Sequence, residues 1–442
     1  MALGHSKTLS TGSDIDLALQ HARENYIDTH PQSAAAFELS ENYMPGGNTR
    51  TVLFHKPFPL RILSGSGCKL TDADGIEYVN MLGEYTAGLF GHNNPVIRKA
   101  IDKALDDGIN LSGHTVNEIK LAQLVCDRFP SIEKVRFTNS GTEANLLAIS
   151  TARYVTGRDK VMVFEGGYHG GLLYFRKGGT PINAPFEYVV ADYNDTQGTA
   201  ALIEQYKDDL ACIVVEPMQG SAGCIPAARD FLAMLRRTSE RTKTVLIFDE
   251  VMTSRLARGG VQEMLDIVPD MTTLGKYIGG GMSFGAFGGA EYLMQIFDPR
   301  DNNAVPHAGT FNNNALTMAA GVAALRDVLT DSALERLNNR GDKLRSDLNR
   351  ICRQYGSCIQ FTGQGSILSL HTTILEIHSV RDLVNCDDRK LELIFLDLLE
   401  QGYYIARRGF IALMLSLEQE QLDGFVEAFS KVINTRSELL MA

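Results

Sequence analysis

The stretch Thr244–Glu250, TVLIFDE, decides the fold class. Its apolar run Val245–Phe248 shows no polar alternation, which is typical of a strand covered on both faces in a parallel sheet. Similar short segments recur along the chain and are separated by helical patterns, the alternation that is typical of α/β proteins. These further expected strands are Lys134–Thr138, Lys160–Phe164, Glu187–Val190, Ala211–Val215 and Thr272–Leu274.

The order of these patterns predicts how the chain is divided. Residues 76–315 are expected to form a large α/β domain, with a mainly parallel central sheet and helices on both faces. Residues 316–442 mix strands and helices and are expected to form a smaller α+β domain. Residues 1–75 are expected to join that smaller domain, with a disordered polar segment at 1–13. The expected helices lie within Asp14–Asn42, Glu118–Phe129, Glu143–Tyr154, Leu316–Leu329 and Ser332–Gln354.

Composition excludes several classes of protein. The net charge of −11 argues against a surface for nucleic acid or anionic membrane. No apolar run is long enough to span a bilayer, and no secretory signal is visible. The seven cysteines are scattered, without the spacing of a zinc site. We therefore expect reduced thiols, no bound metal and a cytoplasmic location.

Two short motifs resemble catalytic signatures without their context. Gly281–Gly285, GMSFG, matches the nucleophile motif of serine hydrolases, but that motif needs a strand before it and a helix after it. Thr244–Glu250 resembles the strand that holds Mg²⁺ in ATPases, but no phosphate-binding P-loop occurs in the chain. The sequence therefore favours neither a serine nucleophile nor a nucleotide site.

One segment after an expected strand is suited to an anion. In Thr138–Asn145, TNSGTEAN, Gly141 lies between the hydroxyls of Ser140 and Thr142 at a helix start. Free backbone N–H groups at such a start bind anions, ideally a phosphate. A plain helix cap is the alternative, since Ser140 and Glu143 also fit a capping box.

A glycine-rich loop, Gly166–Gly171 (GGYHGG), follows another expected strand. Its glycines let the backbone approach a ligand, while Tyr168 and His169 offer flat faces. Since the chain has no tryptophan, Tyr168 is the expected partner for stacking on an aromatic ligand.

Two charged residues end strands of the predicted sheet. Asp249 follows an apolar strand and needs a cationic partner, such as a protonated ring nitrogen. Lys276 follows another strand and precedes the glycines at 279–281. A desolvated lysine has a lowered pKa and can form a Schiff base with a carbonyl group. A structural ion pair for Asp249 and a surface position for Lys276 are the alternatives.

Taken together, these features predict one cofactor. A phosphate anchor, a ring-stacking aromatic, a carboxylate for a pyridinium nitrogen and a Schiff-base lysine are what pyridoxal phosphate requires. The carboxyl ends of strands in an open α/β sheet are also where ligands bind. The glycine clusters at 46–47, 166–171, 279–281 and 288–289 are interpreted as backbone openings around this cofactor.

From about Phe37 to the C-terminal region, the chain resembles the class III, fold-type I, pyridoxal-phosphate-dependent aminotransferases. The resemblance rests on Phe248–Thr253 (FDEVMT), Gly275–Lys276 and His307–Asn314 (HAGTFNNN), which are highly specific in combination.

The resemblance implies a role for each residue of the site. Lys276 binds the cofactor covalently, and Asp249 contacts the pyridine nitrogen. Val251 lies under the ring and Tyr168 covers its other face. An obligate homodimer is implied, with active sites at the interface and Thr310 contributed by the neighbouring subunit. The other implied cofactor contacts are Ser140, Gly141 and Thr142 at the phosphate, and Glu216 and Gln219 near the ring oxygen.

Within this class, the chain resembles the glutamate-1-semialdehyde aminomutase branch and, inside it, the β-amino-acid (β-phenylalanine) aminotransferases. The resemblance to the branch lies in Met44–Arg50 and Asp249–Met252. The resemblance to the inner group lies in Arg50–Phe54, Glu84–Gly88, Thr253–Ala257 and Arg408–Phe410.

Two arginines then carry the substrate prediction, because arginine binds a carboxylate bidentately. Arg50 is expected to hold the carboxylate of a β-amino acid, and Arg408 that of an α-keto acid such as 2-oxoglutarate or pyruvate. The group has one arginine where this chain has Arg407 and Arg408, so the assignment could shift by one. The sequence thus predicts a ping-pong transaminase for a β-amino acid. A pyridoxal-phosphate-dependent isomerase, either an aminomutase or an epimerase, is the alternative.

Overall fold

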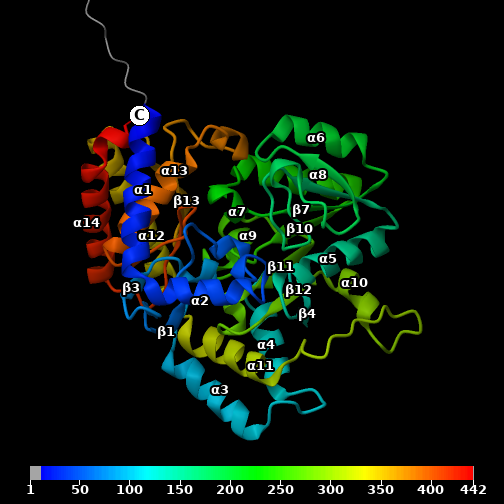
Figure 1. The fold of residues 1–442 in the computed structure, drawn as a ribbon. Coiled ribbons are helices and arrows are strands. Elements are labelled where there is room, and N and C mark those ends of the chain that lie inside the picture. The colour runs from blue at the N-terminus through cyan, green and yellow to red at the C-terminus, as the bar shows by residue number, and fades with distance from the viewer. Residues whose placement is uncertain (1–10, 442) are drawn as a thin grey trace, which may run out of the picture.

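The computed structural model describes residues 11–441 and is organised around a seven-stranded sheet (Figure 1). All of its strands run parallel except β12, which is antiparallel to both of its neighbours. The strand order is β4 (Lys134–Thr138), β12 (Gly285–Gly289), β11 (Met271–Gly275), β10 (Val245–Asp249), β7 (Leu210–Val215), β5 (Lys160–Phe164) and β6 (Glu187–Ala191). The predicted α/β fold with a mainly parallel sheet is confirmed.

Both faces of this sheet are covered, and alternate residues of one strand face different helices. Met162 of β5 packs in a core cluster with residues of α8 (Arg229–Thr242). Its neighbour Val163 packs in a second cluster with residues of α5 (Gly141–Thr156). Because each side of the strand is buried, the sequence needs apolar residues throughout and shows no polar alternation.

The strand β12 corrects the sequence-based interpretation. Gly288 and Gly289 were expected to open the backbone around the cofactor, but they lie in β12, away from the pocket described below. Glycine is required there because the backbone is close on either side. A Cβ on Gly285 would lie 2.1 Å from the carbonyl oxygen of Ser140, and one on Gly288 would lie 2.6 Å from that of Lys134. A strand of glycines lacks the β-branched signal that identifies the other strands.

The C-terminal part forms a second unit of structure. Its antiparallel sheet has the order β13 (Gln360–Gln364), β14 (Ile367–His371) and β16 (Phe410–Ala412). The helices of this part are α12 (Asp331–Gln354), α13 (Asp388–Glu400) and α14 (Gln419–Thr435).

The N-terminal part packs on the C-terminal part, as Figure 1 shows for α1 and α13. The predicted helices are α1 (Thr11–Thr29) and α2 (Pro31–Glu41), so Thr11–Ser13 are helical, where disorder was expected, and residues 1–10 lie outside the described chain. The strands β1 (Ile62–Ser66), β2 (Lys69–Asp72) and β3 (Glu77–Asn80) form one sheet with β15 (Tyr403–Tyr404). The boundary drawn at 75/76 therefore falls inside the β2–β3 hairpin, and the domain division itself stays a prediction.

The remaining helices connect these parts. The expected helix at 316–329 is α11 (Ala315–Ala323) followed by a π-helical turn at Ala324–Val328.

None of the helices within residues 11–441 is both long and apolar enough to cross a membrane. All seven cysteines are free thiols and five of them are buried. Other elements are α3 (Pro95–Asp107), α4 (Val116–Cys126), α6 (Thr196–Gln205), α7 (Gly220–Gly223), α9 (Gly260–Leu265), α10 (Glu291–Met294), β8 (Met218–Gln219) and β9 (Ile225–Pro226).

Candidate active site

The predicted site residues meet at the carboxyl ends of β4, β10 and β11. A cavity of about 290 Å³ lies there. Ten of its lining residues matter below: Ser140, Gly141, Thr142, Asn145, Tyr168, His169, Glu216, Asp249, Val251 and Lys276. Segments far apart in sequence are thus brought together, as expected for ligand sites in open α/β sheets.

Asp249, at the end of β10, is held by three hydrogen bonds. Its Oδ2 accepts from Asn145 Nδ2 and from His169 Nδ1, each at 2.8 Å, and its Oδ1 accepts from the Val251 backbone N–H at 3.0 Å. Burial alone would lower the pKa of His169, but the hydrogen bond and charge of Asp249 raise it overall. The carboxyl group is therefore fixed in position in a buried site.

Sequence reasoning missed part of this network. His169 was expected to offer its flat face, but its ring is buried and its edge binds Asp249. Asn145 was given no role, yet it bridges Asp249 and Thr273, whose hydroxyl donates to Asn145 Oδ1 at 2.7 Å. A polar Asn145 one turn after the helix start, facing the sheet, was the available signal for this contact.

Lys276 directly follows β11 and adopts a left-handed backbone conformation, with φ of 54°. That conformation is costly for a residue other than glycine, and such strain concentrates at functional sites. Burial lowers the pKa of Lys276 to about 8, against the opposing charges of Asp249 and Glu216, while the Arg408 charge adds to the lowering. Lys276 therefore has a substantial unprotonated fraction near neutral pH and can act as a nucleophile.

Glu216 and Gln219 were both expected near the ring oxygen. Glu216 lines the cavity, and its carboxylate accepts from the N–H groups of Tyr168 at 2.9 Å and Gly220 at 3.0 Å. Burial raises its pKa to about 7. Gln219 donates to the Glu165 carbonyl at 3.0 Å, and its buried Oε1 has no partner among residues 11–441. Gln219 does not line the cavity itself.

The start of α5 offers the expected anion site. Ser140 caps the helix by accepting from the Glu143 N–H at 3.2 Å, and the N–H groups of Gly141 and Thr142 find no acceptor within the described chain. Only half of the expected capping box forms, because Glu143 Oε2 accepts from the Asn139 N–H, at 2.9 Å, in place of the Ser140 N–H. Two backbone donors at a helix start therefore remain for a phosphate.

Two residues are candidates for contacting the two faces of the expected cofactor ring. Val251 lies against Gly141, where a Cβ on the glycine would come within 3.0 Å of the valine side chain. Tyr168 lines the same cavity and is 43 % exposed. Ser283 of the GMSFG motif lies at the rim, but β12 follows it, so the hydrolase motif is excluded here as expected. With the Asp249 carboxyl group held in place, free N–H groups at α5 and an amine at Lys276, the site fits pyridoxal phosphate.

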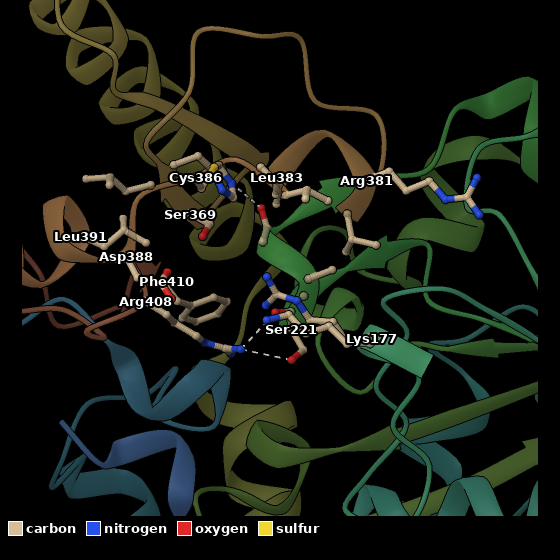
Figure 2. Close-up of a pocket in the computed structure, with 18 of the residues that line it drawn as sticks. Lys177, Ser221, Ser369, Arg381, Leu383, Cys386, Asp388, Leu391, Arg408 and Phe410 are labelled. Carbon is tan, nitrogen blue, oxygen red and sulfur yellow. Dashed lines mark hydrogen bonds between the residues drawn. The ribbon is translucent and has the colours of Figure 1, made fainter. Parts of the chain in front are cut away.

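Neither of the two adjacent arginines lines this cavity, and they differ in their partners. Arg407 binds Glu392 at 2.9 Å, and Glu392 also binds Arg23 of α1 at 2.5 Å. Arg408 donates to the carbonyl and hydroxyl of Ser221, each at 3.1 Å (Figure 2). Its guanidinium carbon lies 5.0 Å from the centre of the Tyr85 ring. Arg408, unlike Arg407, pairs with no carboxylate among residues 11–441, and its assignment to the acceptor stays a prediction.

Arg50, from the N-terminal part, does not line this cavity and contacts a strained turn. It pairs with Glu84 at 2.5 Å. Gly83, Glu84, Tyr85 and Thr86 all have positive φ, between 50° and 79°, and only one of them is glycine. Two residues of this turn contact the arginines, because Glu84 pairs with Arg50 and the ring of Tyr85 lies beside Arg408. Such strain is retained where the surrounding structure fixes it, often at functional sites.

Thr310 lies apart from these residues. It is exposed in the loop before α11 and does not line the cavity of its own chain. A contribution from Thr310 to the site of a neighbouring subunit stays a prediction.

Comparisons with known proteins bear on this geometry. Residues 54–433 match the family model described as aminotransferase class III. The chain belongs to the class III aminotransferases. This class III aminotransferase is 48 % identical over 430 residues to a β-phenylalanine transaminase of Variovorax paradoxus, covering 97 % of this chain and 99 % of the relative. It is 35 % identical over 382 residues to a glutamate-1-semialdehyde 2,1-aminomutase of Methanobrevibacter smithii, covering 84 % of this chain and 90 % of the relative.

Solved structures agree with the fold of the class III aminotransferase. The crystal structure of the β-phenylalanine aminotransferase from Variovorax paradoxus has a TM-score of 0.95 to it, covering 97 % of this chain and 99 % of that one. A transaminase solved with pyridoxal phosphate bound has a TM-score of 0.84 at 30 % identity, covering 92 % of this chain and 97 % of that one.

Proposed function

We propose that this class III aminotransferase moves the amino group of a β-amino acid to an α-keto acid, with 2-oxoglutarate and pyruvate as the candidate acceptors. The cofactor is pyridoxal 5′-phosphate, which supplies an electron sink for the carbanion formed when the donor loses a proton. The relative named as a β-phenylalanine transaminase supports a β-amino donor with an aromatic side chain.

The chain's own residues have separable roles. Asp249, fixed by His169 and Asn145, holds a proton on the ring nitrogen by its charge. Lys276 Nζ, with its pKa lowered to about 8, binds the cofactor and accepts the proton from the amino-bearing carbon of the donor. The N–H groups of Gly141 and Thr142 hold the phosphate.

The observation that carries the proposal is that two arginine charges, neither of which lines the cavity itself, act on Tyr168, which does. Burial raises the pKa of Tyr168, and the charges of both Arg408 and Arg50 oppose that rise. Both guanidinium groups therefore act on a residue that lines the cavity of Lys276. A transaminase binds two carboxylic acids in turn by a ping-pong mechanism and uses two such groups, whereas an isomerase binds one molecule and has less need of a second.

The decisive experiment supplies donor without acceptor. Purified holoenzyme is incubated with aromatic and aliphatic β-amino acids of both hands, with 2-oxoglutarate, with pyruvate, or with neither. We expect a single equivalent of donor to be consumed without acceptor, and continuous turnover once a keto acid is added. Continuous conversion of the donor without any keto acid would instead establish the isomerase.

We further propose a homodimer whose two sites share residues. Exposed apolar side chains on α3, α4 and the loop before α11 support an interface on this side of the molecule; they include Val96, Leu105, Val116, Ile119 and Phe311. Phe311 is 57 % exposed beside Thr310. The test co-expresses Lys276→Ala with Thr310→Arg subunits. If Thr310 acts across the interface, mixed dimers regain one intact site, whereas a role within its own chain leaves every mixed dimer inactive.

A further inference from the structure

Arg408 lines a second cavity of the molecule. Its volume is about 320 Å³, and Figure 2 shows Arg408 and Phe410 on one side of it and Lys177 on the opposite side. The cavity is separate from the one that contains Lys276, and only Arg408 of the site residues above lines it. Its size is at the lower end of those that bind small molecules.

The cavity has more positive than negative charge available to a ligand. Four cationic side chains line it, against the carboxylates of Glu165 and Asp388. Arg381 is occupied by Asp192, and Figure 2 shows it pointing away. Arg176 has no hydrogen bond or ion pair through its guanidinium to any residue in the range 11–441.

Arg408 is similarly free of a counter-charge. Its partners within residues 11–441 are the neutral oxygens of Ser221 and the hydroxyl of Tyr85, and its buried Nε has no partner there. Arg176 and Arg408 thus line one cavity and neither pairs with a carboxylate of the described chain, which favours an anionic ligand.

A buried histidine indicates what kind of anion fits. Burial, with a smaller contribution from the charge of Arg176, lowers the pKa of His371 to about 4. His371 is therefore neutral at physiological pH and adds no charge. Part of the wall is apolar, with Leu370, Val380, Leu383, Leu391 and Phe410. A site with two charged donors and an apolar wall suits an organic acid better than a free inorganic ion.

Arg408 connects this cavity to the active site. Its charge acts on the pKa values of Lys276 and Tyr168, so it lies within electrostatic reach of both. The same side chain cannot pair fully with an acid in the second cavity and with a keto acid at Lys276.

We propose that the second cavity binds a monocarboxylic acid with an apolar body, whose carboxylate is held by Arg176 and Arg408. The bound acid competes for Arg408 and thereby weakens binding of the keto-acid acceptor. This second statement rests on the proposed transaminase function, whereas the binding itself does not.

The test uses 3-phenylpropanoate as the probe and its amide as the uncharged control. Titration calorimetry on the holoenzyme measures binding, and Arg176→Gln is compared with Arg381→Gln, which removes a charge already occupied by Asp192. We expect Arg176→Gln to weaken binding of the acid about tenfold and Arg381→Gln to change it less than about twofold. The amide is expected to bind equally weakly to all three proteins.

Equal binding of the acid to wild type and Arg176→Gln would overturn the proposed site, whatever reaction the enzyme catalyses. Initial rates then test the coupling. In wild type, the acid should raise the apparent KM of the keto acid about fivefold or more at saturation, and Arg176→Gln should reduce that effect. An increase confined to the KM of the amino donor, unchanged in Arg176→Gln, would place the probe at Lys276 and contradict the coupling.

Discussion

The two halves of the active site are built in different ways. The cofactor half consists of strand ends and a helix start, where Asp249, His169 and Asn145 are buried and joined by hydrogen bonds. The proposed substrate half consists of Arg50 and Arg408, which come from the N-terminal and C-terminal parts and lie partly exposed beside a strained turn. The difference teaches that chemistry common to every substrate is fixed rigidly, while recognition depends on side chains that can rearrange.

The largest effect is expected in the cofactor half. Lys276→Ala removes the group that binds the cofactor covalently and moves the donor proton. We expect kcat/KM to fall at least about 10³-fold and the visible absorption of the bound cofactor to change. The matched control is Lys207→Ala, since Lys207 pairs with the surface residue Glu204. Activity retained by Lys276→Ala would contradict the assignment of this half.

Replacing each of the adjacent arginines distinguishes a role in binding the keto acid from a structural role. Arg408→Ala should raise the KM of the keto acid about 10- to 100-fold, with a much smaller effect on the amino donor, because a charged hydrogen-bonding group is lost. Arg407→Ala should leave both KM values nearly unchanged, since Arg407 binds Glu392. Steady-state kinetics with both substrates varied gives the answer. Equal effects of Arg408→Ala on both KM values would contradict the assignment of Arg408 to the keto acid.

A pH experiment tests whether the charge of Arg408 in one half changes the pKa of Lys276 in the other. The unprotonated amine of Lys276 reacts with the cofactor, so uptake of pyridoxal phosphate by the apoenzyme should accelerate as pH rises and level off above about 8. The Arg408 charge lowers the pKa of Lys276, and Arg408→Ala should therefore move this midpoint to higher pH. Stopped-flow absorbance measures the profile. A midpoint that stays in place would mean that the halves are electrostatically independent.

The smallest effect is expected from relief of backbone strain. Glu84 and Lys243 are both left-handed, with φ of 50° and 55°. Replacement of either by glycine should raise the free energy of unfolding by about 0.5–1 kcal/mol, because glycine adopts this conformation without a Cβ clash. Only Glu84→Gly should also change the KM of the amino donor, because it frees Arg50. Denaturant titration and kinetics compare the two variants, and a KM change in Lys243→Gly would discredit the comparison.

The same division explains what could be predicted from the sequence. Lys276 and Asp249 end apolar strands, so the local pattern is enough to predict that they lie in one crevice. The network partner Asn145 was missed because its contact with Asp249 depends on the packing of a helix across the strand ends. The strand β12 was missed because its glycines are required by backbone contacts on both sides, which no local pattern records.

The choice between Arg407 and Arg408 also needed three-dimensional information. Both side chains have the same chemistry and adjacent positions, so charge and spacing could not distinguish them. The distinction arises from their partners, because Glu392 on α13 binds Arg407, whereas Arg408 donates to the neutral oxygens of Ser221. Tertiary partners, rather than residue type, decide which arginine is free to act.

The pairing of Glu392 with both Arg23 and Arg407 has a consequence for work with this chain. Helix α1 is attached by Arg23 to the residue that anchors the immediate neighbour of Arg408. Helix α1 therefore helps to hold α13 and the segment that contains Arg407 in place, although it lies outside the cavity of Lys276. Truncations at this end should stop short of Arg23, because a cut beyond it removes one of the two cationic partners of the buried Glu392 carboxylate and should lower the free energy of unfolding.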